Sequence, residues 1–265
     1  MSLRLTNELH LELRLGSCHV ELVRPGWNRA PVAVADGSGI GAASLCAALQ
    51  ALRLTEVTDW PSTARLTVAD ELACHALLNG DLSRDAAMTL ARTRFCAALD
   101  RDDLRVQVMP LGGSQRWLAA AVTHSDLDLW RDALDQFDVR LTRLHTALLE
   151  DLRRLARDIP EDDAVIALLR DEGVSLVRLR RGLPVSLAWN RFDACQPDSL
   201  EDSLRRFVRT AAAEVRFDRQ CVIYLLPPSR ALCRYVWDGN DLPGLLRRPL
   251  AGIGTRHIAF PAEVA

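Results

Sequence analysis

The sequence predicts an α/β protein built from two similar halves. Residues 8–15 alternate polar and apolar side chains with a period of two, which is typical of a half-buried strand. Residues 41–54 are rich in Ala and Leu, which favour a helix. A similar order of strands and a helix then occurs on both sides of residues 159–163, an acidic segment with a Pro that is typical of a linker.

The N-terminal half begins with a predicted β-hairpin. Gly16 and Ser17 form its turn, and the alternation resumes over residues 18–23, which predicts the return strand. A third strand is predicted over residues 31–35, and the helix over residues 41–54 follows it. Three strands and a helix therefore open this half.

The remainder of the N-terminal half alternates strands with capped helices. Ser83 is expected to cap a helix that runs to Leu99, and Ser125 to cap a helix that runs to Phe137. The other elements expected here are strands at 64–69, 104–109 and 117–122, the last two joined around Gly112 and Gly113, and a helix over 141–158.

The C-terminal half repeats the opening pattern. Strands are predicted at 164–169, 174–179 and 183–190, followed by a helix capped by Asp198 or Ser199 and a strand at 222–226 that Pro227 ends. We expect an N-terminal lobe over residues 1–158, a reduced lobe over residues 164–237 and a Gly- and Pro-rich tail over residues 238–265.

The composition excludes several classes of function. Of 265 residues, 49% are hydrophobic, which is enough for a large core. All 33 basic residues are Arg, so lysine-dependent phosphate binding, Schiff-base chemistry and Ser-Lys pairs are absent. The net charge of −2 argues against a nucleic-acid partner. The clustered arginines are expected to be solvated, namely Arg178, Arg180, Arg181, Arg247 and Arg248.

The lack of a recognisable targeting signal and the cysteine usage both favour the cytosol. No apolar run approaches 18 residues, and the first 14 residues lack the apolar core of a signal peptide. The seven cysteines include no CxxC pair and have apolar neighbours. We therefore expect buried free thiols in a reducing compartment.

Three passages carry a resemblance to a known family. Residues 13–20 lie where that family has its first phosphate hairpin, and residues 117–122 with 125–137 and 139–141 resemble its strand, long helix and return strand. Residues 165–169 with 174–185 resemble its second hairpin. Three antiparallel strands followed by helix, strand and helix is the order of the ribonuclease H-like unit. Two such units resemble the actin-like ATPase superfamily, and most of all the PilM and GspL assembly-platform proteins of bacterial type IV pili and type II secretion, over roughly residues 8–230.

The departures from the family bear on catalysis. Active members hold Mg²⁺ and phosphates with an Asp two residues before the Gly of each hairpin. Here the first position is Arg14, the alignment places Leu168 at the second, and Asp171 with Gly173 has the spacing only later in the turn. Without hard oxygen ligands Mg²⁺ has little to hold it, so ATP with Mg²⁺ is disfavoured and no cofactor is expected.

The resemblance thus implies a non-catalytic scaffold. Its expected partners are membrane-anchored assembly proteins, through the cytoplasmic tail of one of them, and an assembly ATPase, with self-association left open. Its expected location is the cytoplasm, peripheral at the inner membrane through those partners and without inserting into the membrane.

A rival enzyme hypothesis rests on the glycines at Gly37, Gly39 and Gly41. With Ala42 they fit GxGxxA between a strand and a helix, and Glu56 follows where a ribose-binding acid would lie. Two preceding antiparallel strands argue against this motif. Two interpretations of this segment therefore stay open. It is either a flexible turn before a helix, or it binds a nucleotide or dinucleotide, for which Gly16 and Ser17 are further candidates.

Histidine clusters predict no metal site. His10 and His19 lie on the first hairpin with Cys18, and His75 lies near Cys74 and Asp70, but neither group supplies the three or four ligands that metals need.

Tryptophans supply candidate anchors for a partner. Trp117 and Trp130 lie in apolar patterns and are expected in the core. Four others border turns or polar residues, where an exposed indole can bind a partner: Trp27, Trp60, Trp189 and Trp237.

Overall fold

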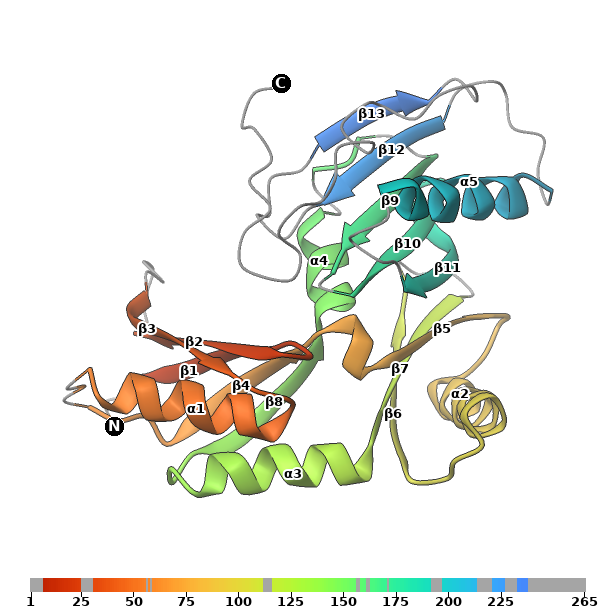
Figure 1. Ribbon diagram of the computed structural model, residues 1–265. Helices are drawn as coiled ribbons and strands as arrows, with labels where there is room; N and C mark the ends of the chain where they lie inside the picture. The colour runs from red at the N-terminus through yellow and green to blue at the C-terminus, as the bar shows by residue number, and fades with distance from the viewer. Residues whose placement is uncertain are drawn as a thin grey trace, which may run out of the picture. The chain divides into compact units, whose positions relative to one another are not determined.

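The computed structural model describes residues 7–24, 31–55, 57, 59–111, 116–155, 158–160, 163–170, 172–191, 197–213, 221–226 and 233–237 (Figure 1). Its helices are α1 Ala42–Arg53, α2 Arg84–Leu99, α3 His124–Asp135, α4 Ala147–Leu155 and α5 Pro197–Ala213. Its strands are β1 Glu8–Leu13, β2 Ser17–Val23, β3 Pro31–Ser38, β4 Thr63–Val68, β5 Cys74–Asn79, β6 Leu104–Pro110, β7 Arg116–Thr123, β8 Arg140–Thr146, β9 Ala164–Leu169, β10 Gly173–Arg180, β11 Leu183–Arg191, β12 Cys221–Leu226 and β13 Cys233–Trp237. No helix in these described ranges is long and apolar enough to cross a membrane.

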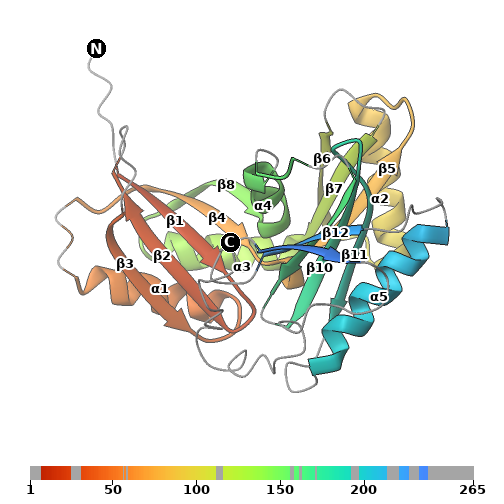
Figure 2. The same cartoon turned by 90° about the horizontal axis from the view of Figure 1, so that it is seen from above.

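The first sheet has the strand order β3-β2-β1-β4-β8. β1 pairs antiparallel with β2 and parallel with β4. Its alternating sequence buries Leu9, Leu11 and Leu13 on one face and leaves the polar residues between them half-buried on the other. α1 and α3 contact each other on the apolar face, where Leu49 and Trp130 join the core (Figures 1 and 2).

The second sheet repeats this arrangement with the order β11-β10-β9-β12-β13. β9 pairs antiparallel with β10 and parallel with β12, as β1 does with β2 and β4. All six residues of β9 are buried, and α5 packs on β10 and β11. The predicted internal repeat is thus present in the pairing of the strands. The halves differ at the last strand, because β13 is antiparallel to β12 whereas β8 is parallel to β4.

A third sheet has the order β5-β7-β6 and includes β5, which the sequence did not predict. The chain forms two compact units, residues 1–74, 92–107 and 120–151 in one, and residues 75–91, 108–119 and 152–265 in the other. These units are interleaved along the sequence. The lobe bounds of residues 1–158 and 164–237 stay predictions.

Several local predictions were wrong. Residues 141–146 belong to strand β8, because they pair in parallel with β4, and only Ala147–Leu155 is helical. Thr123 rather than Ser125 caps α3, since its Oγ1 accepts the Asp126 N–H at 3.0 Å. Asp198 and Ser199 lie inside α5, which begins at Pro197. The Ser83 cap is confirmed by its hydrogen bond from the Ala86 N–H at 3.2 Å.

Burial also departs from expectation at some residues. Arg178 is 6% exposed rather than solvated, because both faces of β10 are covered. Trp117 is half-buried, whereas Trp130 lies in the core as predicted. Among the described thiols, Cys18 is buried, but Cys46, Cys74 and Cys96 are only partly so.

Other predictions fall on residues outside the described ranges. They concern Trp27, Glu56, Gly112, Gly113, Asp171, Pro227, Arg247, Arg248, the acidic part of the expected linker and the tail over residues 238–265.

Candidate functional site

The two hairpins that open the halves have matching turns. Between β1 and β2, the Arg14 N–H donates to the Ser17 carbonyl at 2.8 Å. Between β9 and β10, the Arg170 N–H donates to the Gly173 carbonyl at the same distance of 2.8 Å. Each of these arginines directly follows the last paired residue of its strand. Arg14 and Arg170 therefore occupy equivalent positions in the repeat.

This equivalence corrects the predicted alignment of the second hairpin. Leu168 is fully buried inside β9, and the position that matches Arg14 is Arg170. Both hairpin turns thus carry an arginine at the position where the resemblance leads us to expect a metal-binding Asp. The nearby carboxylate of Glu12 is paired with the Arg14 guanidinium, Oε1 to Nη2, at 2.9 Å. An arginine side chain supplies no ligand for a divalent cation at this position in either half.

The structure brings together two glycine turns that the sequence presents separately. The Gly39 N–H donates to the Gly16 carbonyl at 3.1 Å, and Ser17 pairs with Ser38 across β2 and β3. Gly41 is the N-cap of α1 with φ of 57°, a left-handed conformation that favours glycine. The hydroxyl of Ser44 donates to the Gly41 carbonyl at 2.8 Å. Four of the predicted candidate residues, Gly16, Ser17, Gly39 and Gly41, thus lie around one end of β2 and β3.

Gly37 has a different role from that of a phosphate-binding turn. It lies inside β3, where a Cβ would approach the Ala48 nitrogen and the Ser44 oxygen to 2.2 Å. The absence of a side chain therefore lets α1 pack directly on the strand. β3 is also an edge strand antiparallel to β2, whereas the dinucleotide-binding motif follows a strand of a parallel sheet.

Two of the four candidate tryptophans can be placed by their side chains. The Trp60 Nε1–H donates to the Phe137 carbonyl at 2.9 Å, and the Arg53 guanidinium lies 5.7 Å from its ring centroid. Trp60 thus secures the end of α3 to its own unit. Trp189 on β11 is 42% exposed, so its indole is accessible to a partner. Trp237 lies in β13 with its side chain outside the described atoms, as is all of Trp27.

The histidine and acidic clusters are held by pairwise contacts. On the polar face of the first sheet, His10 contacts Glu8 at 3.2 Å, and His19 contacts Asp36 at 2.8 Å. The buried Asp70 accepts the Leu148 N–H at 2.8 Å, at the beginning of α4. Over the ranges that the structure describes, no group of three His, Cys, Asp or Glu side chains is arranged to hold a metal.

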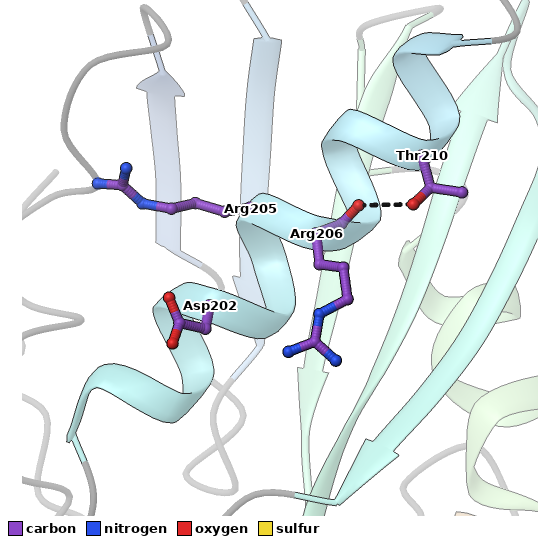
Figure 3. A pocket seen from close by; sticks show the side chains of 4 residues that line it. All are labelled: Asp202, Arg205, Arg206 and Thr210. Atoms are coloured by element: carbon purple, nitrogen blue, oxygen red, sulfur yellow. Dashed lines mark hydrogen bonds between the residues drawn. The ribbon is translucent and has the colours of Figure 1, made fainter.

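A shallow depression of about 280 Å³ lies along α5 (Figure 3). Its lining residues all come from this helix, namely Asp202, Arg205, Arg206 and Thr210. Arg205 is paired with Glu201, and the Thr210 hydroxyl donates to the Arg206 carbonyl at 2.9 Å. A surface supplied by one helix, with its hydroxyl already engaged, has no convergent set of catalytic groups.

Comparison with solved structures identifies the fold. A protein of unknown function from Bacteroides thetaiotaomicron with an actin-like ATPase fold superposes with a TM-score of 0.57 at 11% identity, covering 84% of this chain and 82% of that one. A chain of the PilM–PilN type IV pilus biogenesis complex gives a TM-score of 0.59 at 16% identity, over 84% and 82%. The chain has the actin-like fold. The expected α/β architecture of two ribonuclease H-like halves is confirmed at that level.

A further structural relative is the cytoplasmic domain of EpsL, an inner-membrane component of the type II secretion system of Vibrio cholerae. It gives a TM-score of 0.48 at 13% identity over 84% and 83% of the two chains. No protein-family model and no curated protein sequence matches the actin-like chain described above.

Proposed function

We propose that this actin-like chain is a non-catalytic scaffold of a type IV pilus or type II secretion platform at the inner membrane. It would bind the cytoplasmic tail of a membrane-anchored partner, an assembly ATPase, or both. The proposal is supported by the fold, which is shared over 84% of this chain with a chain of a complex named for type IV pilus biogenesis.

The observation that carries the non-catalytic part of the proposal is the pair of hairpin arginines. Metal-assisted phosphoryl transfer requires carboxylate ligands for Mg²⁺ beside the phosphates. Arg14 and Arg170 stand at the equivalent position in both halves. A guanidinium can hold a carboxylate of a protein partner but cannot ligate a cation.

Thermal denaturation with nucleotides tests the absence of nucleotide chemistry. We expect the melting temperature to stay unchanged with ATP and Mg²⁺ and with NAD or NADP, because a ligand that binds only the folded state must raise it. Gly39→Trp is the diagnostic variant, and Gly80→Trp is its matched control, since both glycines have positive φ, 135° and 127°. A shift that disappears only in Gly39→Trp would overturn the scaffold proposal and favour the nucleotide-binding enzyme.

Binding to membrane-protein tails tests the scaffold role itself. The probes are synthetic peptides that span the cytoplasmic tails of the bitopic inner-membrane proteins encoded with this chain's pilus or secretion genes. Saturable binding of the full chain to one tail is expected. If none of these tails binds, and none of the membrane proteins co-purifies with the chain when co-expressed, the proposed function is wrong.

A further inference from the structure

The first sheet ends in an exposed, partly apolar strand. Within the described part of the chain, β3 is the outermost strand of the sheet, with β2 on one side and no strand on the other. Val32 and Val34 are 46% and 50% exposed on the face opposite α1. An uncovered edge presents unpaired backbone N–H and C=O groups, and a long apolar edge is a template for another strand.

β3 has few of the features that usually protect an edge strand. Pro31 begins the strand and the pairing with β2 is irregular beside it, but the following residues carry neither Pro nor a basic side chain. On the face toward α1, Ala33 and Ala35 are small and partly buried against the core. An added strand could therefore place side chains next to these alanines.

Charge selects the kind of strand that would fit. Glu21 lies opposite Val34, and Asp36 lies opposite His19. In the described structure the carboxylates of Glu21 and Asp36 have only the His19 imidazole as a partner, at 3.4 and 2.8 Å. This end of the β2–β3 pair is therefore acidic. At the other end Val23 pairs with Pro31, and the exposed Arg24 follows Val23.

We infer that β3 binds an extended basic segment by strand addition, with apolar residues beside Val32 and Val34 and Arg or Lys beside Asp36, on the face of the sheet that also carries Glu21. Alternate residues of an added strand share one face, and directly opposite side chains lie about 4.5–5.5 Å apart between Cβ atoms. A segment that alternates in this way can make the apolar and the ionic contacts together. Backbone hydrogen bonds would supply affinity, and the alternating side chains would supply specificity.

The inferred occupant rests on the proposed function for its source. Cytoplasmic segments next to membrane-spanning helices carry an excess of Lys and Arg, so the tail of a membrane-anchored partner has the required charge. A second copy of this chain fits the edge less well, because its own β3 carries no basic side chain that could lie beside Asp36.

Peptide binding to the full chain tests the inference. The probe is a fluorescein-labelled nine-residue peptide in which Val alternates with Thr at one end and Arg alternates with Thr at the other. Controls replace Arg by Glu, or add N-methyl groups to alternate backbone nitrogens. We expect the Arg peptide to bind and its affinity to fall with added salt. Both control peptides should bind at least about tenfold more weakly, since they lose the ionic or the backbone contacts.

Variants of the chain locate the site. Val34→Arg and Asp36→Arg place a cation at β3 and should each weaken binding of the Arg peptide at least about tenfold. Leu129→Arg is the matched control, because Leu129 is an exposed apolar residue on α3, and it should leave binding unchanged. Equal binding of the Arg and Glu peptides, unchanged binding by the two β3 variants, or a dimer of the chain that Val34→Arg dissociates would each overturn the inference.

The outcome is separable from that of the proposed function. If a membrane-protein tail binds the chain and Val34→Arg leaves that binding intact, the β3 inference is wrong while the scaffold role stands. If no tail binds but the Arg peptide binds at β3, the basic-strand site stands and the scaffold role fails.

Discussion

At the scale of single residues, Cys18 makes the stability sensitive to alkaline pH. Burial in the core, and then the carboxylates of Glu12 and Asp36, raise the pKa of this thiol from 9.0 to about 12. The unfolded thiol ionises at lower pH than the folded one. The contribution of Cys18 to the unfolding free energy is therefore fully present below pH 9.0 and is lost as pH rises toward 12. The loss contributed by one such group is at most about 1.4 kcal/mol per pH unit.

Replacement of Cys18 by Ala should remove this contribution. Chemical denaturation at about pH 8 and about pH 10.5 measures the difference in unfolding free energy, and the variant should lose less than the wild type. Cys46→Ala is the control, because burial raises the pKa of that half-buried thiol without help from carboxylates. A Cys18→Ala variant with the same pH dependence as the wild type contradicts the expectation.

Asp70 shows how a buried acid can serve structure rather than chemistry. Asp70 is 4% exposed, and its carboxylate accepts the Leu148 N–H near the beginning of α4. Asp70→Ala leaves that N–H without its acceptor and should cost about 1–3 kcal/mol of unfolding free energy. Asp70→Asn keeps a carbonyl acceptor and should cost less. Asp85→Ala, at an exposed acid in the first turn of α2, serves as the control, and equal losses for Asp70→Ala and Asp85→Ala would refute the role.

At the scale of elements, the contact between β3 and α1 depends on Gly37. A Cβ at this position would lie 2.2 Å from two backbone atoms of the helix, which cannot move without shifting α1. Gly37→Ala should therefore lower the unfolding free energy by about 1–3 kcal/mol, as overpacking does elsewhere. Gly16→Ala is the matched control, because nothing lies within 4 Å of a Cβ there. Thermal or chemical denaturation compares them, and similar midpoints would contradict the close approach.

The period of the apolar residues in the sequence predicted those elements in which the buried residues recur with the same period. The alternation in β1 and β2 matches their alternating exposure, and α3 shows the expected apolar stripe. β8 was misassigned because Leu141, Leu144 and Leu148 have the spacing of a helix face. Parallel pairing with β4 overrides that local pattern over Arg140–Thr146. β5 was not predicted because its sequence, CHALLN, does not alternate polar and apolar residues. Its burial does not alternate either, since its first four residues are all half-buried.

At the scale of the whole molecule, the repeat could be predicted but its details could not. The hydrogen bond between Gly39 and Gly16 depends on how β3 pairs with β2, which no local motif specifies. The equivalence of Arg170 with Arg14 was missed because the second turn has Glu172 where the first has Gly16. The glycine spacing therefore predicts the wrong residue, whereas the pairing of β9 with β10 identifies Arg170.

The interleaving of the compact units predicts how fragments behave. The second unit combines residues 75–91 and 108–119 with residues 152–265. A fragment of residues 1–158 keeps the first two segments without most of the unit in which they pack. Their buried apolar residues, Leu78 and Leu118 among them, would then be exposed to water.

We therefore expect the fragment of residues 1–158 to bind an apolar dye and to unfold without a cooperative transition, whereas the full chain unfolds cooperatively. Co-expression with residues 159–265 should restore cooperative unfolding, because it returns the missing part of the second unit. Calorimetry together with dye fluorescence measures both properties. A fragment of residues 1–158 that melts sharply and binds no dye would instead mean that the N-terminal lobe folds by itself, as the sequence boundary at residue 158 predicts.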